Sequence, residues 1–184
     1  RSSVDADLTD ILIQNNTITV NGTGTGETAG GIFLEGTGNI DADIIGNTFP
    51  GVITGDLNTY GIALRTTGGA IGGSGSPFGL SGHTLSVLSN NADALGIYLF
   101  ADGAVYADGT GISNNTLTVS APSGLAYGIF GHSLHDALYA TVSDNNMSGG
   151  VSGLGASGIR LQAYYDNGGG VSSPTTISHN TLDV

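Results

Sequence analysis

The sequence predicts an all-β chain that folds as one right-handed parallel β-helix, or β-solenoid, of five to six coils with roughly 33 residues each. Two repeated motifs and an alternating apolar pattern predict this fold. In the first motif an aliphatic residue, two small or polar residues, Asn and Thr are followed by another aliphatic residue. It recurs with variations at six anchors: Asn16, Asn47, His83, Asn115, Asn145 and Asn180. The anchors are 31, 36, 32, 30 and 35 residues apart, so we expect a single domain over residues 1–184.

The second motif is Gly-Ile-x-Leu, which lies between successive anchors. It begins at Gly31, Gly61, Gly96, Gly128 and Gly158, with Gly in place of Leu in the fourth copy. Each copy begins 13 to 15 residues after the preceding anchor. Apolar residues alternate in both motifs, as expected for strands with one buried face. Strands this short bury that face by stacking on their copies in neighbouring coils, about 4.8 Å apart, with two or three strands per coil. Right-handed connections are expected between parallel strands.

The anchor column predicts a structural ladder of polar side chains. Asn tolerates the left-handed backbone conformation that a sharp bend between strands needs. Its amide can also donate to one coil while accepting from the next. His83 interrupts the column and could still form hydrogen bonds there.

Composition excludes several classes of function. The chain has no Cys, which excludes disulfides and thiolate metal sites. It has three basic residues, all Arg, against 15 acidic ones, and a net charge of −12 argues against nucleic-acid partners. No run of 18 apolar residues exists, so membrane insertion is not expected. The hydrophobic content of 39% is enough to form a core.

The segment Ile-Ser-Asn-Asn-Thr-Leu at 112–117, followed by Tyr-Gly-Ile-Phe at 127–130, resembles the repeats of the pectin-lyase-like superfamily of right-handed parallel β-helices. The resemblance extends from about residue 8 to residue 184. That superfamily includes polysaccharide lyases and hydrolases, phage tailspikes, autotransporter passenger domains and surface adhesins. The Gly-, Thr-, Asn- and Ser-rich composition without Lys or Cys is most similar to passengers, adhesins and filament repeats.

The catalytic motifs of the enzymatic branches are missing from this sequence. Pectate lyases use a carboxylate cluster for calcium and a basic residue that abstracts a proton. Here there is no Lys, no adjacent Asp pair, and no pair of carboxylates flanking Arg65 or Arg160. Only Gly131-His132-Ser133 is faintly similar to the Gly-His-Gly segment of polygalacturonases. We therefore expect no catalytic residues, with a polysaccharide lyase or hydrolase as the alternative.

The outward positions of the Gly-Ile-x-Leu strands form two columns. One contains Phe33, Ala63, Tyr98, Phe130 and Arg160, and the other contains Glu35, Arg65, Phe100, His132 and Gln162. These columns could stabilise the stack through ion-pair, aromatic and cation–π contacts. Alternatively, they form a binding face for a glycan or a neighbouring subunit. The candidate binding residues are Phe33, Arg65, Tyr98, Phe100, Phe130, His132, Arg160, Tyr164 and Tyr165.

The Asn-Thr strands carry a contrasting outward column: Thr17, Thr48, Thr84, Thr116, Asn146 and Thr181. A second column of Thr19, Pro50, Ser86, Thr118, Ser148 and Asp183 is expected beside it. The array resembles the Thr-x-Thr faces of ice-binding solenoids, which makes ice binding a further alternative. Thr is also simply a good strand residue on a solvated face.

Two longer connections and two carboxylate pairs complete the candidates. The segments Thr66–Gly82 and Ala163–Pro174 both follow a Gly-Ile-x-Leu strand, so we expect loops on the same edge of the rod. The pairs Asp5 with Asp7 and Asp41 with Asp43 could each hold a hard cation such as calcium. We predict no cofactor and no other metal site.

The sequence shows no capping helix at either end of the solenoid. Open strand edges invite pairing, so the chain is expected to be a piece of a longer repeat protein or to self-associate head-to-tail or laterally. The functional hypothesis is a non-catalytic, extracellular or cell-surface structural and adhesive solenoid, a segment or subunit of a surface fibre or adhesin. A glycan-binding or glycan-cleaving module is the main alternative.

Overall fold

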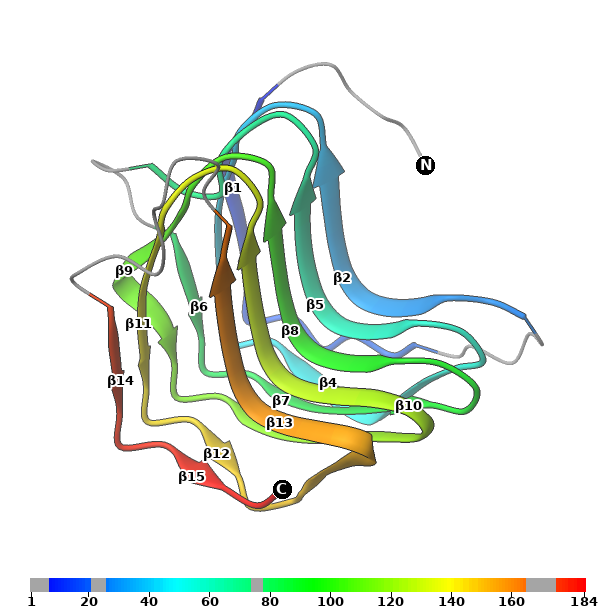
Figure 1. The fold of residues 1–184 in the computed structure, drawn as a ribbon. Helices are drawn as coiled ribbons and strands as arrows, with labels where there is room; N and C mark the ends of the chain where they lie inside the picture. The colour runs from blue at the N-terminus through cyan, green and yellow to red at the C-terminus, as the bar shows by residue number, and fades with distance from the viewer. Residues whose placement is uncertain (1–6, 21–25, 74–77, 165–174) are drawn as a thin grey trace.

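The structure, a computed structural model, describes residues 7–20, 26–73, 78–164 and 175–184, apart from the side chains at 108 and 109. In these residues the chain is all-β and coils into a parallel β-solenoid of about five turns (Figure 1). Equivalent residues in successive turns are roughly 32 positions apart, as Ile97 and Ile129 illustrate. The predicted fold class is confirmed. No helix in the described part of the chain is long and apolar enough to cross a membrane.

Each turn of the solenoid has three faces. The first face is a six-stranded parallel sheet. Its strands, in spatial order, are β1 (Leu8–Gln14), β3 (Ile40–Ile45), β6 (Gly79–Ser81), β9 (Val105–Ser113), β11 (Leu138–Ser143) and β14 (Thr176–Ser178).

The other two faces belong to one nine-stranded sheet that bends around the core. What we call the Asn-Thr face comprises β4 (Thr48–Gly55), β7 (Thr84–Ser89), the first part of β10 (Thr116–Ser133), β12 (Asn146–Met147) and β15 (Thr181–Leu182). What we call the aromatic face comprises β2 (Ala29–Gly36), β5 (Thr59–Thr66), β8 (Ala94–Ala101), the second part of β10, and β13 (Val151–Ala163). Strand β10 makes the bend visible, because it pairs first with β7 and then with β8 (Figure 1).

The core is a set of aliphatic columns contributed by the three faces. The Gly-Ile-x-Leu motif supplies two of them, with Ile62 and Leu64 fully buried and stacked on Ile97 and Leu99. The first face adds Ile44, Leu80, Ile112 and Val142, and the Asn-Thr face adds Leu85, Leu117 and Met147. Each inner turn buries the same positions, so a stack of turns forms the continuous core that one turn alone could not form.

The motif glycine is required by close backbone approach. A Cβ on Gly61 would lie 2.4 Å from the carbonyl oxygen of Gly96, and one on Gly96 would lie 2.5 Å from that of Gly128. The same Cβ on Gly61 would also meet the Leu85 side chain at 2.7 Å. The glycine column therefore lets the aromatic face pack directly against the core side chains of the Asn-Thr face.

The predicted polar ladder is present through all six anchors. The backbone N–H of each anchor donates to the side chain of the next at 2.9–3.1 Å. Each side chain from the second anchor onward also bonds a backbone carbonyl of the preceding turn, three residues before that turn's anchor, at 2.8–3.0 Å. Amide-to-amide bonds join Asn16 to Asn47, Asn115 to Asn145, and Asn145 to Asn180. The ladder thus satisfies buried polar groups at the bend in every turn.

His83 occupies one rung and reproduces most of an asparagine's bonds. Its Nδ1 accepts the backbone N–H of Asn47 at 3.1 Å, and its Nε2 lies 2.9 Å from the carbonyl of Ile44. This pairing requires a neutral ring with the proton on Nε2. The side chain is only 1% exposed, and burial lowers the pKa of His83 below its usual value.

The left-handed bend does not lie at the anchor residue, which corrects the expectation drawn from the Asn column. The residue immediately before each anchor has the positive φ instead: Asn15, Gly46, Gly82, Asn114, Asp144 and His179, at 54° to 72°. A residue in this conformation turns the chain, and the anchor that follows is free to direct its side chain along the stack. The conformation favours Gly, and among other residues Asn, Asp and His, which are the four residue types found at these six positions.

Two further expectations need correction. The segment Thr66–Gly82 is not simply an edge loop, because Ile71 bridges to Ile40 and Val105, and Phe78 is fully buried in the core. The glycines of this segment obscured two buried core positions, one of which, Ile71, continues the first face. The segment Ala163–Pro174 lies largely outside the described residues.

The first Thr column is in register along the whole Asn-Thr face. The prediction of the second column is wrong at two positions. Val52, rather than Pro50, pairs with Ser86 after an irregularity that follows Thr48, since proline has no N–H to donate to a ladder. Ser148 falls in a turn instead of the column, and Val151 resumes pairing with Val119.

Candidate functional site: the aromatic face

Both predicted columns of the aromatic face are in register. Strand pairing stacks Phe33 on Ala63, Ala63 on Tyr98, Tyr98 on Phe130 and Phe130 on Arg160. It also stacks Glu35, Arg65, Phe100, His132 and Gln162 in that order. The solenoid therefore places most of the predicted binding residues side by side on one surface.

A third column was missed by the sequence analysis. It contains the residue before each motif glycine: Gly30, Tyr60, Leu95, Tyr127 and Ser157. If side chains alternated strictly between the two faces of the strand, residues 60 and 127 would point into the core. The alternation is interrupted at the motif glycine. The Gly61 position faces the core, while the Tyr60 ring contacts Phe33 and Tyr98 outside. The signal that could have located the column is the constant position of these residues relative to the motif.

The rings of these columns form a continuous belt along the rod. Ring centroids of successive members are 4.9–6.2 Å apart, which is the range of favourable aromatic contact. The Tyr60 and Tyr98 rings are stacked at 5.6 Å with an interplanar angle of 26°. The members are Phe33, Tyr60, Tyr98, Phe100, Tyr127, Phe130, His132 and Tyr164. Burial among these rings raises the pKa of Tyr98 to about 12.

Arg65 and Arg160 border this belt at different positions. Arg65 forms a salt bridge with Glu35 and lies over the Phe100 ring, 5.7 Å from its centroid. The Arg160 guanidinium lies over Phe130 at 5.4 Å and donates to the Tyr127 hydroxyl at 3.0 Å. Cation–π contacts keep both guanidinium groups over rings of this face.

His132 is the polar member of the belt. Its ring is stacked over Phe130 and meets Phe100 and Tyr164 edge-on. Its Nε2 is buried and has no hydrogen-bond partner within the described part of the chain. Burial, and secondarily the charge of Arg160, lower the pKa of His132. The ring is therefore held neutral near pH 7 and acts as one more flat surface of the belt.

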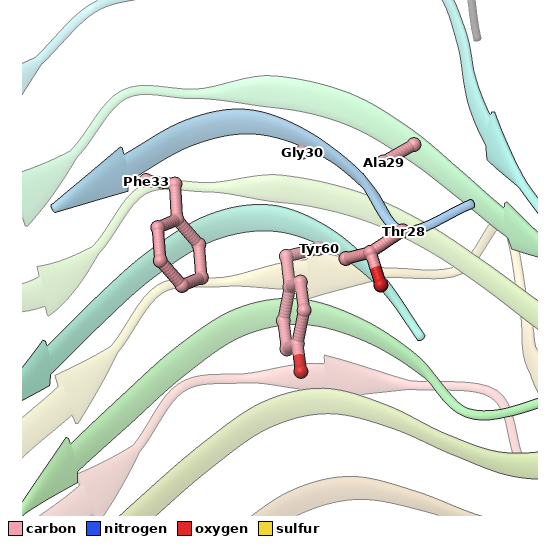
Figure 2. A pocket seen from close by; sticks show the side chains of 5 residues that line it. All are labelled: Thr28, Ala29, Gly30, Phe33 and Tyr60. Carbon is pink, nitrogen blue, oxygen red and sulfur yellow. The ribbon is translucent and has the colours of Figure 1, made fainter. Parts of the chain in front are cut away.

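A hollow of about 430 Å³ opens at the β2 end of the belt, between the rings of Phe33 and Tyr60 (Figure 2). Thr28, Ala29 and Gly30 also line it. The hollow exists because Gly30 is the member of the third column without a side chain. In other turns that position is filled by Tyr60, Leu95 or Tyr127.

The remaining candidates lie elsewhere. Tyr165 and Asp5 are outside the described residues. Asp7 accepts the backbone N–H of Asn39, and Asp43 accepts that of Gly79, at 2.7 and 2.9 Å. Asp41 is half-buried on the same strand as Asp43. Within the described ranges no three His, Cys, Asp or Glu side chains gather in a way that could hold a metal ion.

Comparison with known proteins finds no matching family, no matching curated protein and no matching solved structure.

Proposed function

We propose that this chain is a non-catalytic, extracellular structural and adhesive β-solenoid that serves as a segment or subunit of a surface fibre or adhesin. In character it is closest to the passenger and adhesin repeats of the pectin-lyase-like superfamily. The observation that carries the proposal is the polarity of the Asn ladder. Each anchor offers its N–H in one direction and a side-chain acceptor in the other, so every turn presents the same template to the next.

The apolar columns follow the same logic. In the last described turn Ile177 and Leu182 are 54% and 48% exposed, although both continue columns that are fully buried one turn earlier at Val142 and Met147. A further turn stacked on β14 and β15, from the same polypeptide or from a second copy, would bury them. Rod-like extension is therefore the assembly that this surface favours.

The test is assembly along the rod axis. Sedimentation and electron microscopy should show end-to-end rods for the wild-type chain, and the pair Ile177→Asp and Leu182→Asp should abolish them. Leu125→Asp is the matched control, because Leu125 is 42% exposed on β10, a strand that is paired with neighbours on both sides and so lies inside the rod. A wild-type chain that remains monomeric at its highest soluble concentration would contradict self-assembly.

A glycan-binding module is the second candidate, favoured by the aromatic belt. Aromatic rings at a surface can stack on pyranose rings, and a non-catalytic adhesin needs a binding surface for its target. In the belt Phe33 and Tyr164 are exposed, and the other rings are half-buried except Tyr127, which is buried. Tyr98→Ala and Phe130→Ala should remove glycan-array binding while the far-ultraviolet circular dichroism is retained. An array signal that survives both changes would refute this role for the belt.

A further inference from the structure

We infer that the hollow between Phe33 and Tyr60 is a subsite for one uncharged pyranose ring of a neutral glycan. The inference rests on the second candidate function above and names the position and chemical class of its ligand. It begins with the third column, in which Gly30 leaves a vacancy that a side chain fills in the next three turns. A ligand ring would take the place of the missing side chain.

The walls of the hollow suit one face of a sugar. The Phe33 ring is 40% exposed and lies 5.8 Å from the Tyr60 ring at an interplanar angle of 58°. Tyr60 is supported from behind by its stacked neighbour Tyr98, so the ring that would contact the ligand is already held in place. The Thr28 hydroxyl lies at the same opening, where it can bond a sugar hydroxyl (Figure 2). This combination of apolar walls and a few polar groups is typical of ligand pockets.

Charge decides between neutral and acidic sugars. Carboxylates outnumber basic residues fifteen to three, so the long-range field of the chain repels anions. Among the described residues that line the hollow none is cationic, and Arg65 is already engaged by Glu35. A uronate or sulfated sugar would therefore lack a counter-charge there, whereas a neutral hexose would be accepted.

The structure supplies a variant that closes the hollow without disturbing the fold. A Cβ on Gly30 would have its nearest neighbours at 3.9 and 4.0 Å, which is ordinary contact distance, so Gly30→Leu can extend the column into the vacancy. Ser157→Leu is the matched control, since it adds the same side chain to the same column four turns away. Tyr60→Leu removes the ring that would contact the ligand and places there the residue that the column already has at Leu95.

The experiment is saturation-transfer NMR with methyl β-glucopyranoside, methyl β-galactopyranoside and glucuronic acid. We expect at least one neutral glycoside to receive saturation from the wild-type chain and from Ser157→Leu, with binding about tenfold weaker or lost in Gly30→Leu and Tyr60→Leu. Glucuronic acid should give no signal.

Three results would overturn the inference: no binding of either neutral glycoside to the wild-type chain, binding unchanged in Gly30→Leu, or preference for the acid. Glycan-array binding that depends on Tyr98 while Gly30→Leu has no effect would reject the subsite and leave the belt's general role intact. If the wild-type chain binds no glycan on the array, the proposed glycan-binding function itself is rejected.

Discussion

Replacing His83 with Asn should stabilise the solenoid and remove part of its sensitivity to acid. The ring forms two of the bonds that an asparagine would form, to the backbone of Asn47 and the carbonyl of Ile44. It has no second amide hydrogen, and the amide-to-amide bonds found between other anchors do not reach it. Asn at position 83 could accept from Asn47 and donate to Asn115.

The magnitude follows from counting these bonds. A typical intramolecular hydrogen bond contributes about 0.5–1.5 kcal/mol net, so two restored bonds would give about 1–3 kcal/mol near pH 7.5. Packing loss from the smaller side chain reduces that gain, and we expect about 1 kcal/mol. A lower pH should widen the stability difference between His83→Asn and the wild type. A proton on Nδ1 of His83 would face the Asn47 N–H and leave that donor without an acceptor.

The sign of the pH effect follows from linkage. The folded-state pKa of His83 is lowered relative to the ordinary value of 6.5, mainly by burial. The unfolded state therefore binds this proton first as pH falls. Stability is complete above pH 6.5 and is lost as pH falls from there toward the folded-state pKa, at a limit of about 1.4 kcal/mol for each pH unit.

Urea denaturation of the wild type and His83→Asn, measured from pH 8 to pH 4.5, checks this prediction. Subtracting the two curves cancels contributions from the carboxylates and from His132, leaving the His83 component. The difference should grow below pH 6.5. A difference that is constant with pH would refute the neutral, buried rung, and a destabilised variant at all pH values would show that ring packing outweighs the ladder bonds.

Four other predictions test the ladders and the belt. Gly96→Ala should destabilise by about 3 kcal/mol in urea denaturation, because its Cβ would lie 2.5 Å from the Gly128 carbonyl oxygen; a neutral result would show that the turns can separate. Gly82→Ala has no close contact but a φ of 72°, so it should cost about 1–2 kcal/mol, and Gly82→Asn should cost clearly less by the same assay. Asn115→Leu should cost about 1–3 kcal/mol by leaving ladder groups unpaired, and equal stability would exclude a bonded rung. Ultraviolet titration should show Tyr98 ionising near pH 12, and this late ionisation should be missing in Tyr98→Phe. Because the folded-state pKa is raised above 10, the stability that Tyr98 contributes through this shift is complete below pH 10 and is lost between pH 10 and 12.

Register was predictable because a solenoid stacks each strand on its own copy. Two motifs at nearly constant spacing therefore fix which residues are neighbours, even where residue types differ. The pairing of Phe130 with Arg160, and of Glu35 with Arg65, follows from position within the repeat alone. The ladder was predictable for the same reason, since an amide repeated once per turn has another amide within reach.

Local departures from the repeat could not be predicted in this way. The left-handed residue is Asn, Gly, Asp or His in different turns, so the sequence pattern pointed to the more regular anchor rather than to the variable residue before it. The core role of Phe78 was obscured because glycines surround it in sequence. Tyr60 and Tyr127 reach the aromatic face only because alternation fails at the close-packed glycine, a contact between turns that no single strand reveals.

The stacked columns differ in how much their residues vary, and this distinguishes positions that determine the fold from positions that are free to carry a function. Inside the stack, a glycine needs room for the next turn's carbonyl oxygen and an anchor needs its partner, so these positions vary little from turn to turn. The outward columns have no such constraint, and they vary most: Phe33, Ala63, Tyr98, Phe130 and Arg160 share one position. Packing of a regular solenoid would be served by any repeated strand residue there. The variation in this column, together with the hollow at Gly30 beside the stacked rings of Tyr60 and Tyr98, is therefore the reason to test this face for ligand binding.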